Sequence, residues 1–286
     1  MDKNKQQKIE PGLYLISTPI GNMKDITYRA IDILKKSDII LCEDTRRSSK
    51  LLSFFEIKNQ LTSYHKFNET KLSGKIINLI KSKKIISLIS DAGTPTISDP
   101  GIILINKCIN ENLDIHPIPG PSSVTAAISI SGFDDQYIFY GFLTKKEKQL
   151  ENVLKNLSGL DYSIIFFIPS NKINFYITKF KNYFYDRKIV IAKEMTKMHE
   201  EFIRNDIKSI QASSLNLKGE LTVIISKKIK EKNIKKEIDE SVKIEIKKML
   251  KKYSLKNVVD FMSKKENLQK KMIYNYCLKL KKKNEK

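Results

Sequence analysis

Residues 90–101 place two carboxylates, two glycines and two prolines between an apolar strand pattern and a helical pattern. Glycine lets a backbone approach a ligand closely, and proline fixes the shape of a loop. Asp91 and Asp99 can bind an ammonium, a sulfonium or ribose hydroxyls, although Asp99 ahead of Pro100 is also a typical helix N-cap. The density of these residues predicts a ligand-binding turn, in which Asp91 contacts the ligand and Asp99 caps the next helix.

Three other turns carry residues of the same kind, at 17–22, 43–47 and 119–123, and each follows a predicted strand. In an open parallel sheet the carboxyl ends of the strands meet at one edge, where ligands bind. The four turns are therefore expected to line one cleft. Ser122 and Ser123 begin a predicted helix there, so their N–H groups can hold a carboxylate or a phosphate; the alternative is that Ser122 only caps the helix.

Other polar residues give weaker signals. His65 follows a tyrosine in a predicted loop and can act as a base, although a structural role is more frequent. Glu194 and Lys197 follow a predicted strand and can either face the cleft or form a solvated pair. The sequence contains neither a GxGxxG motif after the first strand nor a Walker loop, which argues against a dinucleotide or a nucleoside triphosphate as the ligand.

The pattern of apolar runs predicts two α/β domains and a helical extension. Residues 12–132 alternate strands with helices, and the continuous apolar strands favour a mainly parallel sheet that is covered on both faces. Residues 137–226 alternate less regularly and predict a mixed sheet. Residues 240–286 are rich in lysine with helical apolar spacing, which predicts a small basic extension of two or three helices that ends in a disordered tail.

The formal net charge of +21 favours a polyanionic partner. Only five of the 53 basic residues are arginine, however, and a genome rich in A and T also produces an excess of lysine. The retained arginines are therefore the better markers of a nucleic-acid surface. Arg46 and Arg47 form the only adjacent pair of arginines in the chain.

The cysteines and histidines are scattered along the chain. Cys42, Cys108 and Cys277 are far apart, which predicts neither a disulfide framework nor a metal site. The polar N-terminus lacks the apolar core of a signal peptide, and apolar runs stay shorter than the roughly 18 residues of a membrane helix. We therefore expect a cytoplasmic protein without a membrane partner.

Short motifs between residues 12 and 226 follow one another in the order found in a known enzyme family. Over this range the chain resembles the ribosomal RNA small subunit methyltransferase I family, which belongs to the tetrapyrrole-methylase-like superfamily. The motifs that carry the resemblance are LYLISTPIGN at 13–22, EDTR at 43–46, SDAGTP at 90–95, SDPG at 98–101, PGPS at 119–122, GFL at 141–143, EMTK at 194–197 and KGE at 218–220.

The resemblance implies a class III methyltransferase fold that binds S-adenosylmethionine between its two α/β domains. It implies methylation of the ribose 2′-oxygen of cytidine 1402 in the 16S rRNA of the small ribosomal subunit, by a homodimer that acts on RNA and not on DNA. By similarity to the wider class, the residues lining the cosubstrate pocket are Ile20, Ser90, Asp91, Thr94, Ser122, Ser123, Ile168 and Met195.

Methyl transfer to a ribose hydroxyl needs a base, because the hydroxyl is a weak acid. We expect Glu43 and Asp44 to fill this catalytic role, with local turn capping as the alternative for both. Arg46, Arg47 and Lys145 are expected to contact RNA, since arginine pairs well with phosphate and lysine adds salt-dependent affinity.

One segment departs from the family pattern. After the strand at 163–167 the family usually carries a Glu-Ser/Ala-x-His-Arg sequence, whereas this chain reads IPSNK at 168–172. A catalytic or RNA-binding role for this segment is therefore weakened, and a non-catalytic RNA-binding or ribosome-assembly protein stays open as an alternative. The other alternative is a methyltransferase for a tetrapyrrole or another small molecule, against which the EDTR turn and the basic extension argue.

Overall fold

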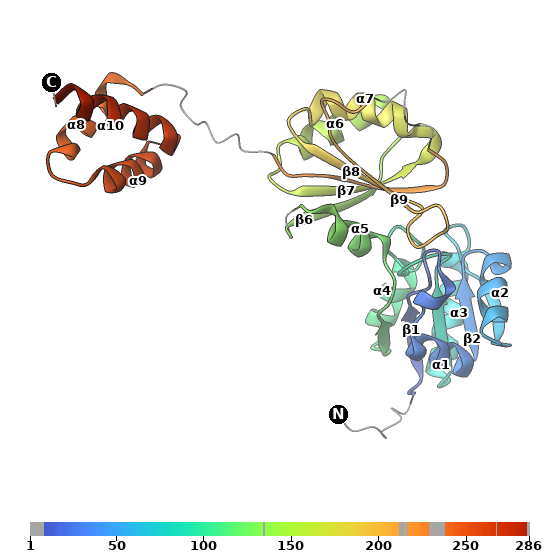
Figure 1. Cartoon of the computed structure of the whole chain (residues 1–286). Helices are drawn as coiled ribbons and strands as arrows, with labels where there is room; N and C mark the ends of the chain where they lie inside the picture. The colour runs from blue at the N-terminus through green and yellow to red at the C-terminus, as the bar shows by residue number, and fades with distance from the viewer. Residues whose placement is uncertain are drawn as a thin grey trace. The chain divides into compact units, whose positions relative to one another are not determined.

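The computed structural model describes residues 9–133, 135–211, 215, 217–228, 238–266 and 268–284, with side chains up to residue 280. Its Cα positions form two compact units, Met1–Lys228 and Ile229–Lys286. The first unit contains two five-stranded sheets, and the second contains helices (Figure 1). Because both sheets belong to one unit, the expected domain boundary between residues 132 and 137 stays a prediction, as does the one between residues 226 and 240.

The first sheet is entirely parallel, with strand order β3-β2-β4-β1-β5. This confirms the parallel sheet that the apolar runs predict. Its strands are β1 (Gly12–Ile16), β2 (Ile39–Cys42), β3 (Gln60–Ser63), β4 (Ile85–Ile89) and β5 (Ile115–Ile118). The helices that follow these strands are α1 (Tyr28–Lys36), α2 (Thr45–Phe54), α3 (Glu69–Lys81), α4 (Ile102–Asn110) and α5 (Ser123–Ser131).

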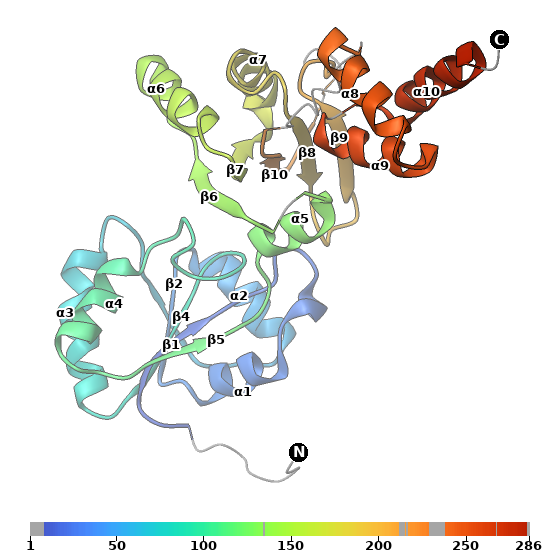
Figure 2. The ribbon, with the colours of Figure 1, turned by 90° about the vertical axis from the view of Figure 1, so that its left-hand side faces the viewer.

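Both faces of this sheet are buried, because successive side chains of a strand point to opposite faces. Tyr14 and Ile16 of β1 pack in one cluster with residues of α1 and α2. Leu13 packs in a second cluster with residues of α3 and α4. Helices therefore cover the sheet on both sides (Figure 2). The polar turns lie at the ends of its strands.

The second sheet is mixed, as predicted, with strand order β6-β7-β10-β8-β9. β6 and β7 are parallel and the remaining pairs are antiparallel. Its strands are β6 (Tyr137–Phe142), β7 (Ser163–Pro169), β8 (Lys188–Lys193), β9 (Glu201–Asp206) and β10 (Glu220–Ile225). The helices α6 (Glu147–Ser158) and α7 (Ile173–Tyr183) pack on one face, and α5 packs on the other.

Two local features are not evident from the apolar pattern. Thr27 caps α1, since its hydroxyl accepts the N–H of Ala30 at 3.2 Å, while Asp25 lies in a short 3-10 turn just before. The other feature is strand β3. It is an edge strand with exposed or half-buried side chains, so it lacks the apolar run that marks its neighbours.

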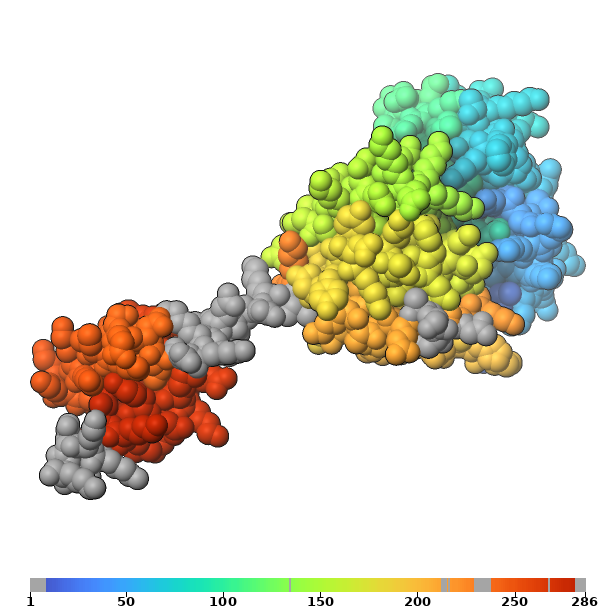
Figure 3. Space-filling model, turned by 90° about the horizontal axis from the view of Figure 1, so that it is seen from above, coloured from blue at the N-terminus to red at the C-terminus, as the bar shows by residue number. Residues whose placement is uncertain are grey.

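The second unit consists of α8 (Glu240–Leu250), α9 (Leu255–Lys265) and α10 (Lys270–Asn284). Their apolar faces meet in a small core that includes Ile246, Met262 and Cys277, and their side chains form one compact body (Figure 3). The helical extension is confirmed, but its last helix reaches Asn284, where the sequence predicts a disordered tail. Among the described helices, none combines the length and the apolar character that crossing a membrane requires.

Candidate functional site

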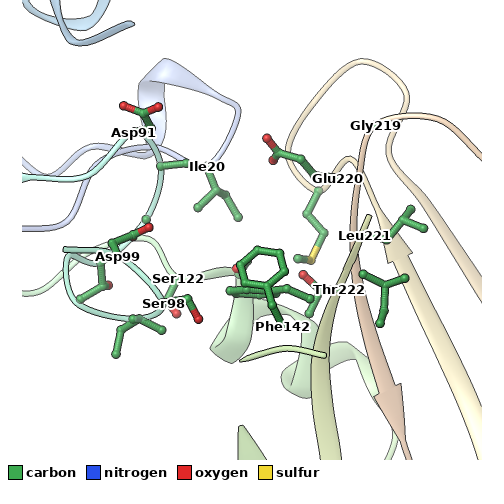
Figure 4. A pocket seen from close by; sticks show the side chains of 18 of the residues that line it. Ile20, Asp91, Ser98, Asp99, Ser122, Phe142, Gly219, Glu220, Leu221 and Thr222 are labelled. Carbon is green, nitrogen blue, oxygen red and sulfur yellow. The ribbon is translucent and has the colours of Figure 1, made fainter. Parts of the chain in front are cut away.

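A cavity of about 440 Å³ lies where the carboxyl ends of the first sheet face the second sheet. The four turns singled out in the sequence meet here, as predicted from the topology of a parallel sheet. They form a polar wall with Asp91, Asp99 and Ser122, and the opposite wall carries Phe142 and Leu221 (Figure 4). The remaining lining residues of that wall include Phe167, Ile168, Pro169, Met195, Gly219, Glu220 and Thr222.

The structure brings together most of the residues expected around a cosubstrate. Those that line the cavity are Ile20, Asp91, Thr94, Ser122, Ser123, Ile168 and Met195. Ser90 is the exception: it is buried behind the loop, and its hydroxyl lies 3.3 Å from the carbonyl oxygens of Ala92 and Gly93. Ser90 therefore shapes the turn from behind.

Hydrogen bonds join three of the turns into one wall. The backbones of Thr18 and Gly93 pair in both directions, at 2.9 and 3.0 Å. The hydroxyl of Thr94 lies 2.9 Å from that of Ser17 and donates to the carbonyl of Pro121 at 3.2 Å. Gly93 has a φ of +77°, a conformation that glycine adopts without steric cost. The wall is thus held in place by its own backbone before any ligand arrives.

The loop from Asp91 to Gly101 is strained. Thr96 and Ser98 have φ values of 70° and 73°, which non-glycine residues rarely adopt. Gly101, with φ +131°, is the N-cap of α4, and its N–H donates to the buried carboxylate of Glu69 at 3.2 Å. The predicted helix cap at Asp99 is therefore wrong. Strained backbone of this kind clusters at functional sites.

Asp99 faces the cavity, where its environment favours the protonated form. Burial, together with the carboxylates of Glu43 and Asp91, raises the pKa of Asp99 to about 6, and a hydrogen bond from Ser90 opposes this rise. A carboxyl group with a raised pKa inside a cleft is suited to accept a proton near neutral pH. Sequence reasoning missed this role, because the spacing before Pro100 also fits a helix cap.

Glu43 and Asp44 are neighbours in the chain but have different surroundings. Asp44 is the N-cap of α2 and accepts the N–H of Arg46 at 2.9 Å. Its carboxylate also binds the Arg46 guanidinium at 2.8 and 3.1 Å, and these bonds hold the pKa of Asp44 well below its usual range. Glu43 lines the cavity. Asp44 therefore has the capping role that was the alternative for both residues, and the geometry favours Glu43 for a catalytic role.

Asp91 connects two of the turns at the edge of the cavity (Figure 4). One of its oxygens accepts the N–H of Asp44 at 3.2 Å, and the other pairs with Arg47 at 3.2 Å. Arg46 and Arg47 both border a second, more open pocket beside the cavity. Lys145 is exposed beyond the end of β6 and is not among the residues that line either pocket.

Glu194 supports the opposite wall from behind. Its Oε1 accepts the N–H of Glu220 at 2.8 Å and pairs with Lys197 at 3.0 Å. Lys197 also pairs with Glu220 at 3.0 Å. A Cβ at Gly219, where φ is +89°, would lie 2.4 Å from Glu194, so only glycine fits. The Glu194–Lys197 pair therefore shapes the turn before β10, and Glu220, which sequence reasoning missed, lines the cavity.

The segment that departs from the family pattern contributes only its first residues to the cavity. Ile168 and Pro169 line it. Ser170–Lys172, which follow directly in the chain, form a 3-10 turn and are not among the lining residues. Among the described residues, no group of three or more histidine, cysteine or acidic side chains is placed to hold a metal ion.

The beginning of α5 offers donors to an anionic group. Ser122 is the N-cap of this helix, and among the described residues its hydroxyl has no capping bond, so it stays available to a ligand. The free N–H groups of the first helical turn and the helix dipole favour a carboxylate or phosphate there. The cavity therefore combines an anion site, acidic side chains and an apolar wall.

Comparisons with known proteins agree with this geometry. The family model of the Tetrapyrrole (Corrin/Porphyrin) Methylases matches residues 12–211. The ribosomal RNA small subunit methyltransferase I of Mesomycoplasma conjunctivae is 43% identical over 226 residues, which cover 78% of this chain and 93% of that protein. The protein of the same name from Buchnera aphidicola is 36% identical over 278 residues, covering 93% and 96%.

A solved structure shares the fold. The uroporphyrin-III C-methyltransferase of Thermus thermophilus, complexed with S-adenyl homocysteine, superposes with a TM-score of 0.55 at 10% identity and covers 75% of this chain and 97% of that chain. Its likeness confirms the two-sheet methylase architecture. By its family match and its relatives, the chain belongs to the tetrapyrrole methylases and, among them, to the ribosomal RNA small subunit methyltransferase I family.

Proposed function

We propose that the protein transfers a methyl group from S-adenosylmethionine to the ribose 2′-oxygen of cytidine 1402 in 16S rRNA. The names of its relatives support an rRNA substrate, and the motif resemblance supports this nucleotide and oxygen. The observation that carries the proposal is the cavity, in which acidic side chains and a helix N-terminus face an apolar wall.

The cavity fits S-adenosylmethionine by size and by chemistry. Its volume of about 440 Å³ lies in the usual range of small-molecule sites. The N-terminus of α5 suits the carboxylate of the methionine part, Asp91 and Glu220 suit its cationic groups or the ribose hydroxyls, and the wall around Phe167 and Leu221 suits the adenine ring. When bound, the cosubstrate supplies a methyl group that is already electrophilic.

The contribution of the protein is then to position the ribose hydroxyl and to take its proton. We assign proton acceptance to Asp99, with Glu43 as the neighbouring carboxylate that orients the hydroxyl. Both line the cavity, and Asp99 has the pKa that a base needs near neutral pH. Arg46, Arg47 and Lys145 are proposed to bind RNA phosphates, and the net charge of +21 adds affinity that falls with salt.

The test is mass spectrometry of 16S rRNA from cells with and without the gene. We expect 2′-O-methylcytidine at position 1402 only in cells that have the gene. A non-catalytic assembly protein would leave the modification unchanged while ribosome assembly suffers. A small-molecule methyltransferase would leave the rRNA unchanged and methylate a tetrapyrrole in vitro. The purified protein with S-adenosylmethionine and 16S rRNA should restore the modification.

Replacing Asp91 with alanine is expected to weaken S-adenosylmethionine binding about 10- to 100-fold, because a charged hydrogen-bond partner is lost. Isothermal titration calorimetry measures the change. Arg47→Ala is the matched control, since it removes the ion pair with Asp91 and leaves the carboxylate in place. If both variants lose the same affinity, Asp91 acts only by holding the turn, and its assignment to the cosubstrate fails.

We further propose that the protein acts as a homodimer in the cytoplasm, as the resemblance implies. Light scattering during gel filtration should give twice the chain mass of 33.1 kDa. A single-chain mass at micromolar concentration would contradict the dimer.

A further inference from the structure

A second pocket of about 510 Å³ adjoins the cavity at its polar wall. It is lined by the turn from Glu43 to Arg47, by Asp91, by Ser63 at the end of β3, and by His65, Lys66 and Phe67 in the loop that follows. Glu43, Arg47 and Asp91 border both pockets, so the two pockets lie next to each other. A polymer with one unit in the cavity would place a neighbouring unit over this second pocket.

Phe67 presents its ring to solvent beside this pocket. The residue is 97% exposed, although a large apolar side chain is normally buried. Its ring lies 5.9 Å from that of His65, at an angle of 65°. An exposed aromatic face next to basic side chains is the arrangement that single-stranded nucleic acids use for base stacking. Phe67 therefore has the properties of a stacking surface.

The loop that carries Phe67 is fixed although its tip is exposed. Tyr64 is fully buried, and its N–H donates to the carbonyl of Cys42 at 2.8 Å. Asn68 accepts the N–H of His65 at 2.8 Å and donates to the carbonyl of Ser63 at 3.0 Å. The ring is thus presented by a preorganised loop, which reduces the entropy lost on binding.

Basic side chains stand beside this ring. The side chain of Arg46 is 88% exposed although it pairs with Asp44, and that pair uses only the N–H groups on Nε and Nη2. Lys66 is exposed in the same loop as Phe67, and both residues line the pocket. Aromatic and cationic groups side by side match a nucleotide, which presents a flat base and a charged phosphate.

We propose that this second pocket binds the RNA nucleotide next to the one that is methylated, with its base stacked on Phe67 and its phosphate held by Arg46 and Lys66. The inference rests on the proposed function, since it presumes an RNA substrate in the cavity. Stacking accepts any base, so the pocket contributes affinity and fixes the position of the RNA strand without selecting its sequence.

The chain contains no tryptophan, so a single one introduced at position 67 gives an unambiguous fluorescence signal. In Phe67→Trp, binding of a short oligocytidylate should quench the tryptophan in a saturable way, because the base stacks on the indole. Phe54→Trp is the control: Phe54 is 60% exposed at the last residue of α2, about 14 Å along the helix from the turn at the pocket. Its fluorescence should stay unchanged.

Two further variants measure the affinity itself. Phe67→Ala should weaken oligocytidylate binding about 5- to 100-fold in fluorescence anisotropy, with S-adenosylmethionine affinity unchanged. Lys66→Ala should weaken binding and reduce the slope of log affinity against log salt by about 0.7. Phe54→Ala should match the unmodified protein in both measurements.

The proposal is overturned if Phe67→Trp binds oligocytidylate without quenching, or if Phe67→Ala binds it as tightly as Phe54→Ala. These outcomes are distinct from failure of the proposed function. An unmodified protein that does not methylate rRNA, but whose Phe67→Trp variant is quenched, would keep the nucleotide pocket and lose the reaction. Methylation without quenching would keep the reaction and lose the pocket.

Discussion

Asp99→Asn is expected to lower the rate of methyl transfer by about 10²- to 10⁴-fold and at the same time to stabilise the folded protein at neutral pH. The loss of rate follows from removing the proposed proton acceptor, because the asparagine amide cannot take the hydroxyl proton. The gain in stability follows from removing a charge that the folded structure disfavours. The two effects have opposite signs, which a general loss of structure would not produce.

The sign of the stability effect follows from the pKa of Asp99. Burial and the carboxylate of Glu43 raise it from 3.8 to about 6 in the folded protein. Stability from this group is therefore fully present below pH 3.8 and is lost as the pH rises through about 6, because over this range the unfolded chain has released the proton that the folded protein still binds. The loss amounts to at most about 3 kcal/mol. Because Asp99 is partly exposed, solvent screening reduces it to about 1 kcal/mol.

Urea unfolding and single-turnover kinetics across the pH range test both effects. The stability gain of Asp99→Asn should disappear near pH 4, and the unmodified enzyme should gain rate as the pH rises through about 6. Glu43→Gln should shift that rise to lower pH, because it removes the nearby charge that raises the pKa of Asp99. Asp44→Ala should keep the rise near 6 and lose some stability, since Asp44 caps α2 and alanine cannot accept the capping bond. An active Asp99→Asn enzyme would rule out Asp99 as the base.

The convergence of the four turns could be predicted because it depends on topology alone. In a parallel sheet every strand that is followed by a helix presents its carboxyl end at the same edge. The apolar runs of β1, β2 and β4 identify such strands from sequence. The cavity therefore follows from local patterns once the sheet is recognised as parallel.

The role of Asp99 could not be predicted in this way, because it depends on a contact between distant residues. Local spacing favours a helix that starts at Pro100 with Asp99 as its cap. In the structure, Glu69 at the start of α3 accepts the N–H of Gly101, so α4 begins two residues later. Asp99 is thereby left free to face the cavity. Neighbouring residues in the sequence give no sign of the carboxylate of Glu69.

The retained arginines do not all mark an RNA surface, because their use also depends on contacts with residues that are distant in the sequence. Arg46 and Arg47 lie at the polar turn and border the open pocket. Arg204 instead donates to the carbonyl of Ile130 at 2.7 Å, and Arg187 is fully buried. A guanidinium serves equally well to bind phosphates and to satisfy backbone carbonyls. Composition does not distinguish these two uses, whereas burial does.

Arg187→Met is expected to destabilise the protein by about 3–5 kcal/mol. Arg187 is only 1% exposed, and its guanidinium donates to four carbonyl oxygens. These belong to Ser158 at the end of α6 and Leu160 just beyond it, at 2.8 and 2.7 Å, and to Tyr162 and Ser226 next to strands of the second sheet, both at 3.2 Å. Methionine fills similar space but leaves these carbonyls buried without a donor.

Burial lowers the pKa of Arg187, yet the side chain stays charged, because the intrinsic pKa of a guanidinium is so high. The ring of Phe184 lies 5.1 Å from its central carbon and adds a cation–π contact. Arg187→Lys keeps the positive charge but replaces the planar guanidinium, with its five donors, by an ammonium group with three. It should therefore lose less stability than Arg187→Met but more than the control variant below. Thermal unfolding should show a loss of about 10 °C for Arg187→Met.

Arg29→Met is the matched control, because Arg29 is exposed and makes one long bond of 3.4 Å to the carbonyl of Pro117. It should change stability by less than about 0.5 kcal/mol. Below its unfolding temperature, Arg187→Met should bind RNA with an unchanged salt dependence, since a buried guanidinium contacts no phosphate. An Arg187→Met variant of normal stability would show that the four carbonyl bonds contribute little to the fold. A variant with a smaller salt slope would show that Arg187 contacts the RNA.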